Sequence, residues 1–461
     1  MLRAYTAATR TARVLSAARP RAAYHVLAIE TSCDDTTLAL IDRPEQGPPR
    51  LITHVKRSLD NTKAGGIIPL DARNFHQQNL APMVRDLFAQ YNVVPLPGSA
   101  SSSSGSDSLK IDLICATRGP GMIGSLSAGY NFAKGLSVAL NVPLVGVHHM
   151  VGHLLTPRFF QALPASAGDA TAADIPEYPF FSLLVSGGHT MLVRSASPTD
   201  HTVLANTVDI AIGDMLDKCA RELGLTGNML GQELEKFINT PAPAAMDEAS
   251  AAALAAIRFP NPLQNKSGRA ADRAAYSFAG FITSLRTAVA KYFPAAAEGE
   301  PPALDLATRR ALAERLQAAI FKHLVSKTGL ALRAYFDAQP PADGQQGTPV
   351  DIVCAGGVAS NLTLRAMLEE ELRKPVPPPR KKKGSSSAAS AAESPEQRPA
   401  PQFRFHYPAP KWCTDNALMI GWAGVEFWET ARLHTDLTAL PTAKWPIEEV
   451  LAIDGWLPRT D

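Results

Sequence analysis

Two histidines four residues apart are the clearest candidates for metal chemistry in this sequence. His149 and His153 lie in the run HHMVGH (148–153), which follows an apolar stretch and opens a segment with helical periodicity. On a helix this spacing places both imidazoles on one face, where their neutral nitrogens suit a divalent metal. A bare pair of this kind is also compatible with histidines that are simply buried or exposed.

The same pair argues against a zinc protease of the HExxH type. Such a protease needs a glutamate directly after the first histidine as its general base. That position is Met150, and no acid lies between His149 and His153. The missing base therefore excludes this class of protease.

A carboxylate far downstream can complete such a metal site. Asp415 lies in CTDN (413–416), at the predicted start of a helix. Helix capping by Thr414 or Asp415 is a structural alternative. Two histidines and one aspartate would leave coordination positions open for substrate, which is typical of catalytic rather than structural metals.

Glycine-rich turns follow three predicted strands and suit a phosphate-bearing ligand. They are RGPGMIGS (118–125), VSGGHT (185–190) and AGGVASN (355–361). Backbone N–H groups at such turns can approach an anion closely, and open α/β sheets bind ligands beyond the carboxyl ends of their strands. Two of these turns have structural alternatives. VSGGHT can be a plain hairpin turn, and Asn361 in AGGVASN can cap the helix that follows. Asp217, in GDMLDK (213–218), can accept from sugar hydroxyls or be a solvated carboxylate beside Lys218.

The elements that must position these residues alternate between strand and helix. Short apolar, β-branched runs predict strands at 26–32, 38–42, 111–119, 143–149, 181–188, 190–196 and 351–357. Helical periodicity is present at 125–140, 150–160, 211–223, 308–336, 362–372 and 416–432. This alternation favours an α/β architecture.

Composition limits the class of protein. A chain of 461 residues with 46% hydrophobic and 19% charged residues is typical of a globular protein with about two to three domains. Because 45 basic residues are balanced by 43 acidic ones, an RNA partner would need a local basic patch. No apolar run is long enough for a membrane span, which excludes an integral membrane role. The five scattered cysteines form no CxxC, which excludes a disulfide scaffold and suggests a reducing compartment.

The first residues have the composition of a mitochondrial transit peptide. Residues 1–24 contain five arginines, no acid and many Ala, Ser and Thr residues. A disordered basic tail is the alternative. Six Ala-, Pro- and Ser-rich segments are interpreted as surface insertions that cannot bury enough apolar area to fold: 95–108, 162–179, 241–256, 294–303, 338–349 and 373–402. The last contains a cationic cluster (380–383) that suits RNA phosphates or a solvated linker.

Taken together and in order, these motifs resemble the TsaD-type tRNA threonylcarbamoyladenosine transferases, once called glycoproteases. The matching blocks are VLAIETSCDDT, GGIIP, GPGMIGSLSAG, VHHMVGHLL, LLVSGGHT, GDMLDKCARELGL, AGGVASN and CTDNALMIGWAG. They extend from Val26 to about Gly424. With its basic leader the chain resembles the mitochondrial, stand-alone branch of the family.

The resemblance implies an α/β fold of the actin/hexokinase (ASKHA) type, with two lobes around a nucleotide cleft. Lobe I is expected at 25–155 and 405–458 and lobe II at 156–404. The implied reaction moves a threonylcarbamoyl group from threonylcarbamoyl-AMP to N6 of the adenosine on the 3′ side of the anticodon, in tRNAs that read A-starting codons. The resemblance also implies a homodimer in the mitochondrial matrix, without membrane attachment.

The resemblance further implies roles for single residues. His149, His153 and Asp415 match the ligands of one divalent ion per subunit, Zn or Fe. Asp34 and Asp35 match an acidic pair beside the reactive centre, although the family usually has Glu at the second place. The residues that match donor and nucleotide contacts are Leu184, Val185, Ser186, Gly187, Gly188, Asp217, Gly231, Glu235, Ser360 and Asn361. The block YSFAGFITSL (276–285) lacks the lysine of its family counterpart, and Gly231 is one glycine where the family tends to have two.

These roles predict an acyl transfer that depends on positioning and on stabilising negative charge. The metal would act as a Lewis acid toward the threonylcarbamoyl end, and Asp34 would orient or deprotonate the adenine amine. Candidate RNA contacts are Arg57, Lys63, Arg73 and Arg118. The competing interpretations are a small-molecule kinase of the same fold and a non-enzymatic nucleotide-dependent scaffold. Metal bound in the absence of nucleotide would favour the transferase.

Overall fold

A computed structural model of the chain describes residues 23–61, 66–93, 108–161, 175–227, 229–241, 246–259, 261–263, 273–293, 304–339, 349–374 and 401–459. The predicted transit segment, apart from its last two residues, and the cationic cluster at 380–383 lie outside these ranges. Within them, no helix combines the length and the apolar character that crossing a bilayer requires.

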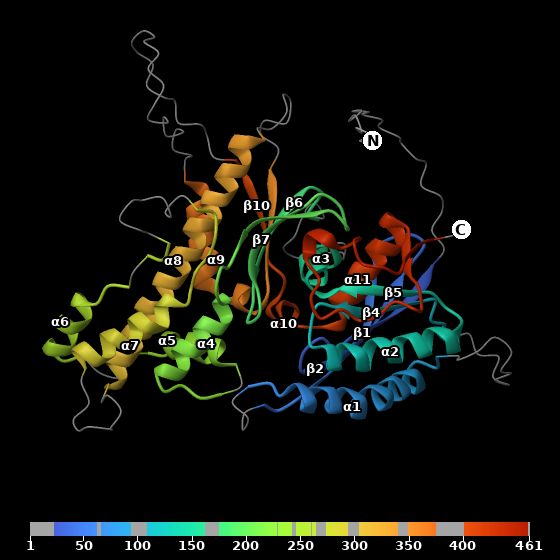
Figure 1. The fold of residues 1–461 in the computed structure, drawn as a ribbon, viewed down its shortest axis with the longest axis horizontal. Coiled ribbons are helices and arrows are strands. Elements are labelled where there is room, and N and C mark those ends of the chain that lie inside the picture. Colours follow the sequence, from blue (N-terminus) through green and yellow to red (C-terminus); the bar gives the residue numbers. More distant parts are fainter. Residues whose placement is uncertain are drawn as a thin grey trace, which may run out of the picture.

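The first half of the molecule is a five-stranded sheet with helices on both faces (Figure 1). Its strand order is β3 (Arg50–Ser58), β2 (Asp35–Arg43), β1 (Tyr24–Glu30), β4 (Leu113–Gly119) and β5 (Leu144–His148). The first three strands pair antiparallel, and β1, β4 and β5 pair parallel. Helices α1 (Pro69–Gln90) and α2 (Ile123–Leu140) cover one face, where Leu27 and Ile29 of β1 join their core. Val26 and Ala28 point to the other face because side chains alternate along a strand.

The second half is another five-stranded sheet, in the order β10 (Phe403–His406), β9 (Val350–Ala355), β6 (Phe180–Val185), β7 (Thr190–Ser195) and β8 (His201–Asn206). A group of helices covers one face and shares its core with Phe181, Leu183 and Val185 of β6. This group is α4 (Ile212–Glu222), α5 (Leu230–Asn239), α6 (Glu248–Ala256), α7 (Gly280–Tyr292), α8 (Leu306–Ala338) and α9 (Leu362–Arg373). Figure 1 shows these helices on the left, away from the first sheet.

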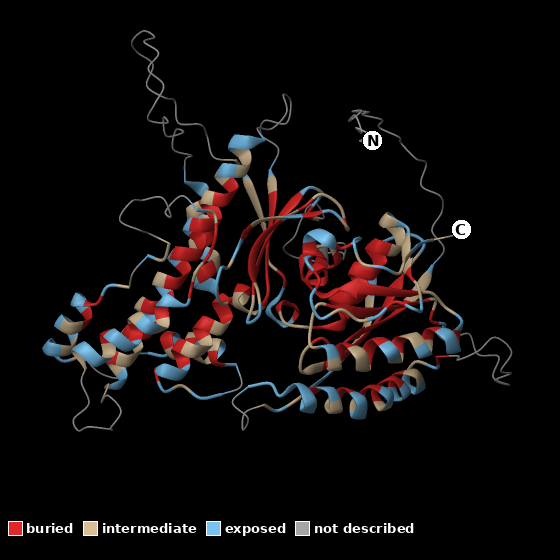
Figure 2. Cartoon of the chain, viewed as in Figure 1, coloured by how far each residue is buried: buried red, intermediate tan, exposed pale blue. Residues whose placement is uncertain are grey.

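Two helices lie between the sheets and join them. Helices α3 (His149–Gln161) and α11 (Ala417–Glu426) contribute to a single buried cluster with the inner faces of both sheets. That cluster includes Val26 of β1 and Leu184 of β6. In Figure 2 both sheets and the two helices between them are coloured mainly as buried. The structure therefore has the α/β organisation predicted from the strand–helix alternation.

The remaining elements are short and follow the main ones. They are η1 (Gly357–Ser360), α10 (Pro410–Cys413), η2 (Phe427–Ala431), β11 (Leu433–Thr435), η3 (Ile447–Glu449) and β12 (Trp456–Pro458). The predicted helix at 416–432 is thus divided into α11 and a wider last turn, η2.

The interpretation of 241–256 as an unfolded insertion is wrong for its second part. Residues 248–256 form α6, whose N-terminus is capped by Asp247 accepting from the N–H of Ser250. Leu254 is 5% exposed and packs in the core of the second half. Its Ala-rich composition favours helix, which lets one apolar side chain anchor the segment. Residues 242–245 lie outside the described ranges.

The predicted lobe boundaries differ from the borders of the elements. The boundary between 404 and 405 falls inside β10, which pairs with β9 in the second sheet. The boundary between 155 and 156 falls inside α3, which packs between the sheets. The division into lobe I and lobe II at these residues stays a prediction.

Candidate active site

The two histidines of the HHMVGH run begin the helix between the sheets. His149 is the first residue of α3 and His153 follows one turn later, as predicted from their spacing. Both are nearly buried, with 7% and 4% of their surface exposed. Gly152 permits close contact with α11, because a Cβ there would lie 3.1 Å from side-chain atoms of Ile420 and Met419.

The carboxylate that meets them comes from the start of the other central helix. Asp415 lies between α10 and α11, directly before Asn416. Asn416 caps α11, since its side chain accepts from the N–H of Met419 at 2.9 Å. The alternative in which Thr414 or Asp415 caps the helix is therefore wrong, and the Asp415 side chain is available to the histidines.

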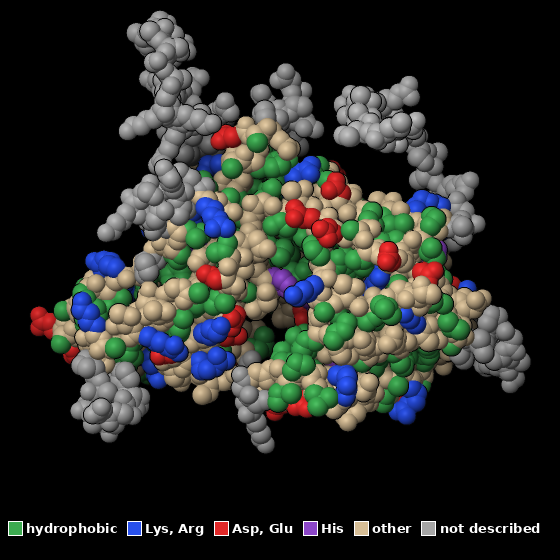
Figure 3. Space-filling view, viewed as in Figure 1, with side chains coloured by type: hydrophobic (Ala, Val, Ile, Leu, Met, Phe, Trp, Pro, Cys, Tyr) green, Lys and Arg blue, Asp and Glu red, His purple; other side chains and the backbone are tan. Residues whose placement is uncertain are grey.

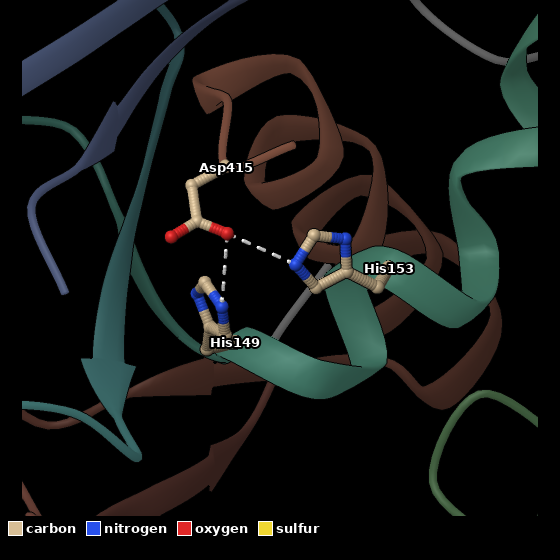
Figure 4. A group of neighbouring side chains, drawn as sticks. All are labelled: His149, His153 and Asp415. Atoms are coloured by element: carbon tan, nitrogen blue, oxygen red, sulfur yellow. Dashed lines mark hydrogen bonds and ion pairs between the residues drawn. The ribbon is translucent and has the colours of Figure 1, made fainter. Parts of the chain in front are cut away.

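Figure 4 shows the three side chains pointing toward one another. One oxygen of Asp415, Oδ1, lies 3.4 Å from Nε2 of His149 and 3.1 Å from Nε2 of His153. A ligand atom from each of the three residues lies within 4.8 Å of the others. Two imidazole nitrogens and a carboxylate oxygen at this separation fit a divalent cation. Because the Asp415 side chain is 28% exposed, the cluster opens to solvent on that side.

Interactions between opposite charges stabilise the cluster of His149, His153 and Asp415 in the absence of a metal. Burial alone would lower the pKa of His149, but the charges of Asp415 and Glu30 raise it to about 10. Burial likewise opposes ionisation of Asp415, and the charge and hydrogen bonds of the two histidines hold its pKa well below the usual range. A metal at Nε2 of His149 must therefore displace a proton.

A second group of polar side chains lies behind His149, and the sequence analysis missed it. Glu30, at the end of β1, has one oxygen 3.5 Å from Nδ1 of His149. Ser32 lies between them, with its Oγ 3.1 Å from the same nitrogen. The available signal was an acid at the end of an otherwise apolar strand, where burial of a charge requires partners.

The acidic pair spans the last residue of the turn after β1 and the first residue of β2, and Asp34 lies within electrostatic reach of the metal cluster. Asp34 accepts from the side-chain amide of Asn61 at 2.8 Å. Burial raises the pKa of Asp34, and the charges of Asp35 and Asp415 add to this effect. Asp35 instead forms an ion pair with Lys56. The pair therefore consists of one carboxylate held by an amide and one neutralised by a lysine.

The SGG loop approaches the metal cluster from the second sheet. Gly187 and Gly188 are exposed at the turn from β6 to β7, and Ser186 bonds with the backbone of His189 inside that turn. His189 was not predicted as a site residue. Burial and the charges of His149 and His153 lower the pKa of His189 to about 4. His189 of this loop therefore lies within electrostatic reach of the metal cluster.

The side chains of Leu184 and Val185 are buried in opposite faces of the second sheet. Their backbones pair with β7, and Leu184 also pairs with β9. A donor contact at these two positions stays a prediction.

Two glycines allow the loops around this turn to meet. Gly356 has φ +98°, and a Cβ on it would lie 2.4 Å from the carbonyl oxygen of Val185. Gly213, in the first turn of α4, would place a Cβ 2.7 Å from backbone atoms of Ser186 and Gly187. Only glycine fits such positions without displacement of the backbone. The loop after β9 and the start of α4 consequently pack directly on the SGG loop.

Asp217 and Gly231 are brought together. Oδ1 of Asp217 accepts from the N–H of Gly231 at 2.7 Å, which joins α4 to the first turn of α5. Burial raises the pKa of Asp217, and this hydrogen bond opposes the rise. Glu235 follows one turn later on α5 and is partly exposed.

Ser360 and Asn361, the residues predicted for the second nucleotide loop, have hydrogen-bond partners within the fold. Asn361 caps α9 by accepting from the N–H of Leu364 at 3.1 Å, and its amide lies 3.4 Å from Oε1 of Gln317. Ser360 donates to the carbonyl of Gly357 at 2.7 Å. The capping alternative for Asn361 is thus confirmed, while a ligand contact stays a prediction.

The candidate RNA contacts have different surroundings. Arg57 and Arg73 are exposed, and Arg57 donates to Asn79 at 2.9 Å. Arg118 is only 3% exposed and donates to the carbonyl of Leu440, so its prediction as a surface contact is wrong. Its guanidinium lies over the ring of Trp445 instead. Lys63 lies outside the described residues. Figure 3 shows the surface hollowed between the two halves, with a histidine and a basic side chain at the rim.

The family model described as TsaD, tRNA N6-adenosine threonylcarbamoyltransferase, matches residues 50–422. The chain belongs to the TsaD family. This membership confirms the predicted family of enzymes and its actin/hexokinase-type α/β fold.

Related proteins with the same description match this chain over nearly their whole length. The mitochondrial tRNA N6-adenosine threonylcarbamoyltransferase of Schizosaccharomyces pombe is 32% identical over 94% of this chain and 89% of its own. The tRNA N6-adenosine threonylcarbamoyltransferase of Ruegeria pomeroyi is 31% identical over 92% of this chain and 94% of its own. That of Methylibium petroleiphilum is 32% identical over 94% of this chain and 99% of its own.

Membership in the TsaD family separates the main interpretation from its alternatives. A small-molecule kinase shares the glycine loops of this fold but has no need of the cluster formed by His149, His153 and Asp415. A scaffold needs neither that cluster nor the acidic pair beside it. The TsaD assignment and the geometry thus agree on a transferase.

Proposed function

We propose that the protein transfers a threonylcarbamoyl group from threonylcarbamoyl-AMP to N6 of the adenosine on the 3′ side of the anticodon. Its substrates are tRNAs that read A-starting codons. The observation that carries the proposal is the convergence of His149, His153 and Asp415 beside the SGG loop in a TsaD chain.

The metal site takes one divalent ion per subunit, zinc or iron. His149 and His153 supply imidazole nitrogens and Asp415 supplies a carboxylate oxygen. A divalent ion held by these residues would supply Lewis-acid polarisation of the threonylcarbamoyl end of the donor. The exposed side of Asp415 leaves room for that end to enter.

The donor nucleotide lies along the loops of the second half. The segment Leu184 to Gly188 contacts the donor at its turn, where the glycines leave space for the ligand to approach the backbone N–H groups of Gly187 and Gly188. Asp217 accepts from ribose hydroxyls, with Gly231 and Glu235 nearby on α5. Ser360 and Asn361 form the second nucleotide loop. The close packing at Gly356 and Gly213 holds these loops together.

The acceptor adenosine reaches the site next to the acidic pair. Its exocyclic amine is a weak nucleophile, and Asp34 accepts a hydrogen bond or a proton from it. A raised pKa suits Asp34 to this role, because a stronger base takes the proton more readily. Asp35, held by Lys56, limits repulsion at the pair. The new bond between N6 and the carbamoyl carbon replaces the bond from that carbon to the phosphate oxygen, so AMP leaves with the electron pair. The amine proton passes to Asp34 and from there to solvent.

We also propose that the protein works as a homodimer in the mitochondrial matrix. The relative from Schizosaccharomyces pombe, whose name includes "mitochondrial", and the basic composition of residues 1–24 support this location. Light scattering on the purified protein, and fractionation of cells that express the full chain, test these two points.

The decisive experiment incubates the purified protein with threonylcarbamoyl-AMP and unmodified mitochondrial tRNA, followed by nucleoside mass analysis. We expect threonylcarbamoyladenosine to form, and His153→Ala to abolish its formation while the protein stays folded. Phosphorylation of a small molecule without tRNA modification would support the kinase alternative. Nucleotide binding with no modification of any substrate would support a scaffold.

A further inference from the structure

A buried carboxylate lies directly behind the metal cluster. Glu30 is 1% exposed, although an ionised carboxylate in an apolar strand is costly unless donors or charges surround it. The backbone N–H of Ser32 donates to its Oε1 at 2.7 Å, and the Ser32 hydroxyl donates to the same oxygen. The hydroxyl of Thr117 donates to Oε2. Both oxygens of Glu30 therefore accept hydrogen bonds from the fold, which holds the carboxylate in one orientation.

The sheet itself builds this arrangement. Glu30 ends β1, and Thr117 lies on the neighbouring parallel strand β4, one residue after the pair formed by Ile29 and Ala116. Ser32 follows in the turn after β1. The carboxyl ends of two adjacent strands thus place the acid and both hydroxyls directly beneath the first turn of α3.

Ser32 connects the carboxylate to His149. Its single hydroxyl hydrogen points to Glu30, and its Oγ lies 3.1 Å from Nδ1 of His149. The oxygen can therefore act toward the imidazole only as an acceptor, and Nδ1 must carry the proton. Glu30 Oε1, at 3.5 Å from Nδ1, favours the same state. An imidazole that carries its neutral-state proton on Nδ1 presents a lone pair at Nε2, the atom that faces Asp415.

We propose that Glu30, acting through Ser32, is a positioning residue that fixes the ring orientation and tautomer of His149 for a divalent cation at Nε2. The inference rests on the proposed metal site. Carboxylates that hold the second nitrogen of a metal-bound histidine orient its ring and increase its basicity, and their loss typically weakens metal binding about 10- to 100-fold. Glu30 faces Nδ1 of His149, the ring nitrogen on the far side from the proposed metal position, so its effect passes through His149.

The test titrates Zn²⁺ into chelator-stripped full-length protein, in competition with a chromogenic chelator. Glu30→Gln and Ser32→Ala are expected to raise the Kd for Zn²⁺ about 10- to 100-fold, with full occupancy restored at higher Zn²⁺. Ser32→Ala is the milder change and keeps the test available if Glu30→Gln unfolds. Asp351→Asn is the matched control, because Asp351 is also a buried carboxylate, 2.8 Å from His406, but lies in the second sheet. It should keep the wild-type Kd.

A second readout separates positioning from general destabilisation. Proton–nitrogen NMR of the Zn²⁺-loaded wild type should show a slowly exchanging Nδ1–H on His149, and this signal should weaken or vanish in Glu30→Gln but persist in Asp351→Asn. Wild-type Kd and an unchanged Nδ1–H signal in both Glu30→Gln and Ser32→Ala would overturn the inference alone. A wild-type protein that binds no Zn²⁺ would overturn the metal part of the proposed function together with it.

Discussion

At the scale of single residues, Asp415 and Asn416 at the start of α11 have separate roles, one toward the metal cluster and one as the helix cap. Asn416 accepts from the N–H of Met419 and donates its amide to the carbonyls of Trp412 and Thr414. Asp415 is therefore not needed as a cap, and its carboxylate turns to His149 and His153. The buried amide fixes the backbone on which the metal-facing carboxylate depends.

Asp34 is the residue whose chemical role can be tested most directly. Asp34→Asn keeps the size of the side chain but cannot take a proton, so single-turnover transfer should slow by about 10²- to 10⁴-fold. Zn²⁺ content should stay at the wild-type level, since Asp34 belongs to the turn and not to the metal cluster. The measurement is the rate at which threonylcarbamoyladenosine forms when enzyme and donor are both in excess over tRNA. Full single-turnover transfer in the variant would rule out Asp34 as the group that assists the amine.

His201 makes the stability of the second sheet depend on pH. Its Nε2–H donates to the carbonyl of Pro198 at 3.0 Å, and its Nδ1 lies 2.9 Å from the hydroxyl of Ser195, which donates to it. Burial lowers the pKa of His201 to about 4, below the value near 6.5 expected in the unfolded chain. Because the folded pKa is depressed, the stabilisation is complete above pH ~6.5 and is lost as the pH falls toward ~4, by about 3 kcal/mol at most.

The measurement for His201 is the free energy of unfolding in urea between pH ~7.5 and ~4.5. His201→Gln should be less stable at neutral pH but should lose less stability on acidification than the wild type. The comparison is made between the two proteins because other buried histidines also titrate in this range. Equal losses in both would show that His201 does not contribute to the pH dependence.

At the scale of elements, the contact between the ends of β6 and β9 depends on one backbone conformation. Gly356→Ala must place a methyl group 2.4 Å from the carbonyl oxygen of Val185, at φ +98°. We expect a loss of stability of about 1–3 kcal/mol from the backbone strain alone and weaker binding of an AMP analogue. Gly357→Ala is the matched control, since a Cβ there meets nothing within 4 Å. Equal binding and stability in the two variants would show that the close approach of Gly356 to Val185 does not support the nucleotide loops.

The sequence predicted the elements with strong periodicity and missed the polar or interrupted ones. Strands β1, β4, β6 and β9 are buried throughout or nearly so, and their apolar runs were sufficient to find them. The outer strand β3, Arg50–Ser58, has no fully buried residue and therefore no apolar run. Helix α1 contains Pro82, a residue that normally marks the end of a helix.

Only part of the site could be predicted from the sequence, because its residues come from elements that are far apart along the chain. The spacing of His149 and His153 identified one helix face, but nothing local connects them to Asp415, more than 260 residues later. That connection came from the resemblance to a family. Glu30 escaped even this approach, because its importance comes from Thr117 on a neighbouring strand and from His149 on a helix. Contacts between distant elements require the fold.

At the scale of the whole molecule, the metal cluster lies where the two halves of the chain meet. His149 and His153 belong to α3, Asp415 precedes α11, and both helices share their core with the two sheets. The SGG loop of the second sheet is electrostatically coupled to the same cluster. A ligand that ties α3 to α11 should therefore stabilise the packing between the sheets and not merely a local turn.

Metal removal tests this link between the site and the fold. Binding to the folded state alone stabilises by about 2.7 kcal/mol when free Zn²⁺ is 100 times Kd, so Zn²⁺ should raise the Tm of the stripped protein and chelation should reverse the rise. Hydrogen exchange should slow in α3 and α11 together, because the cluster joins them. His153→Ala should show neither effect, since one of three ligands is gone. An equal rise in Tm for His153→Ala would mean that Zn²⁺ acts elsewhere, whereas protection confined to α3 would mean that Asp415 does not share the ion.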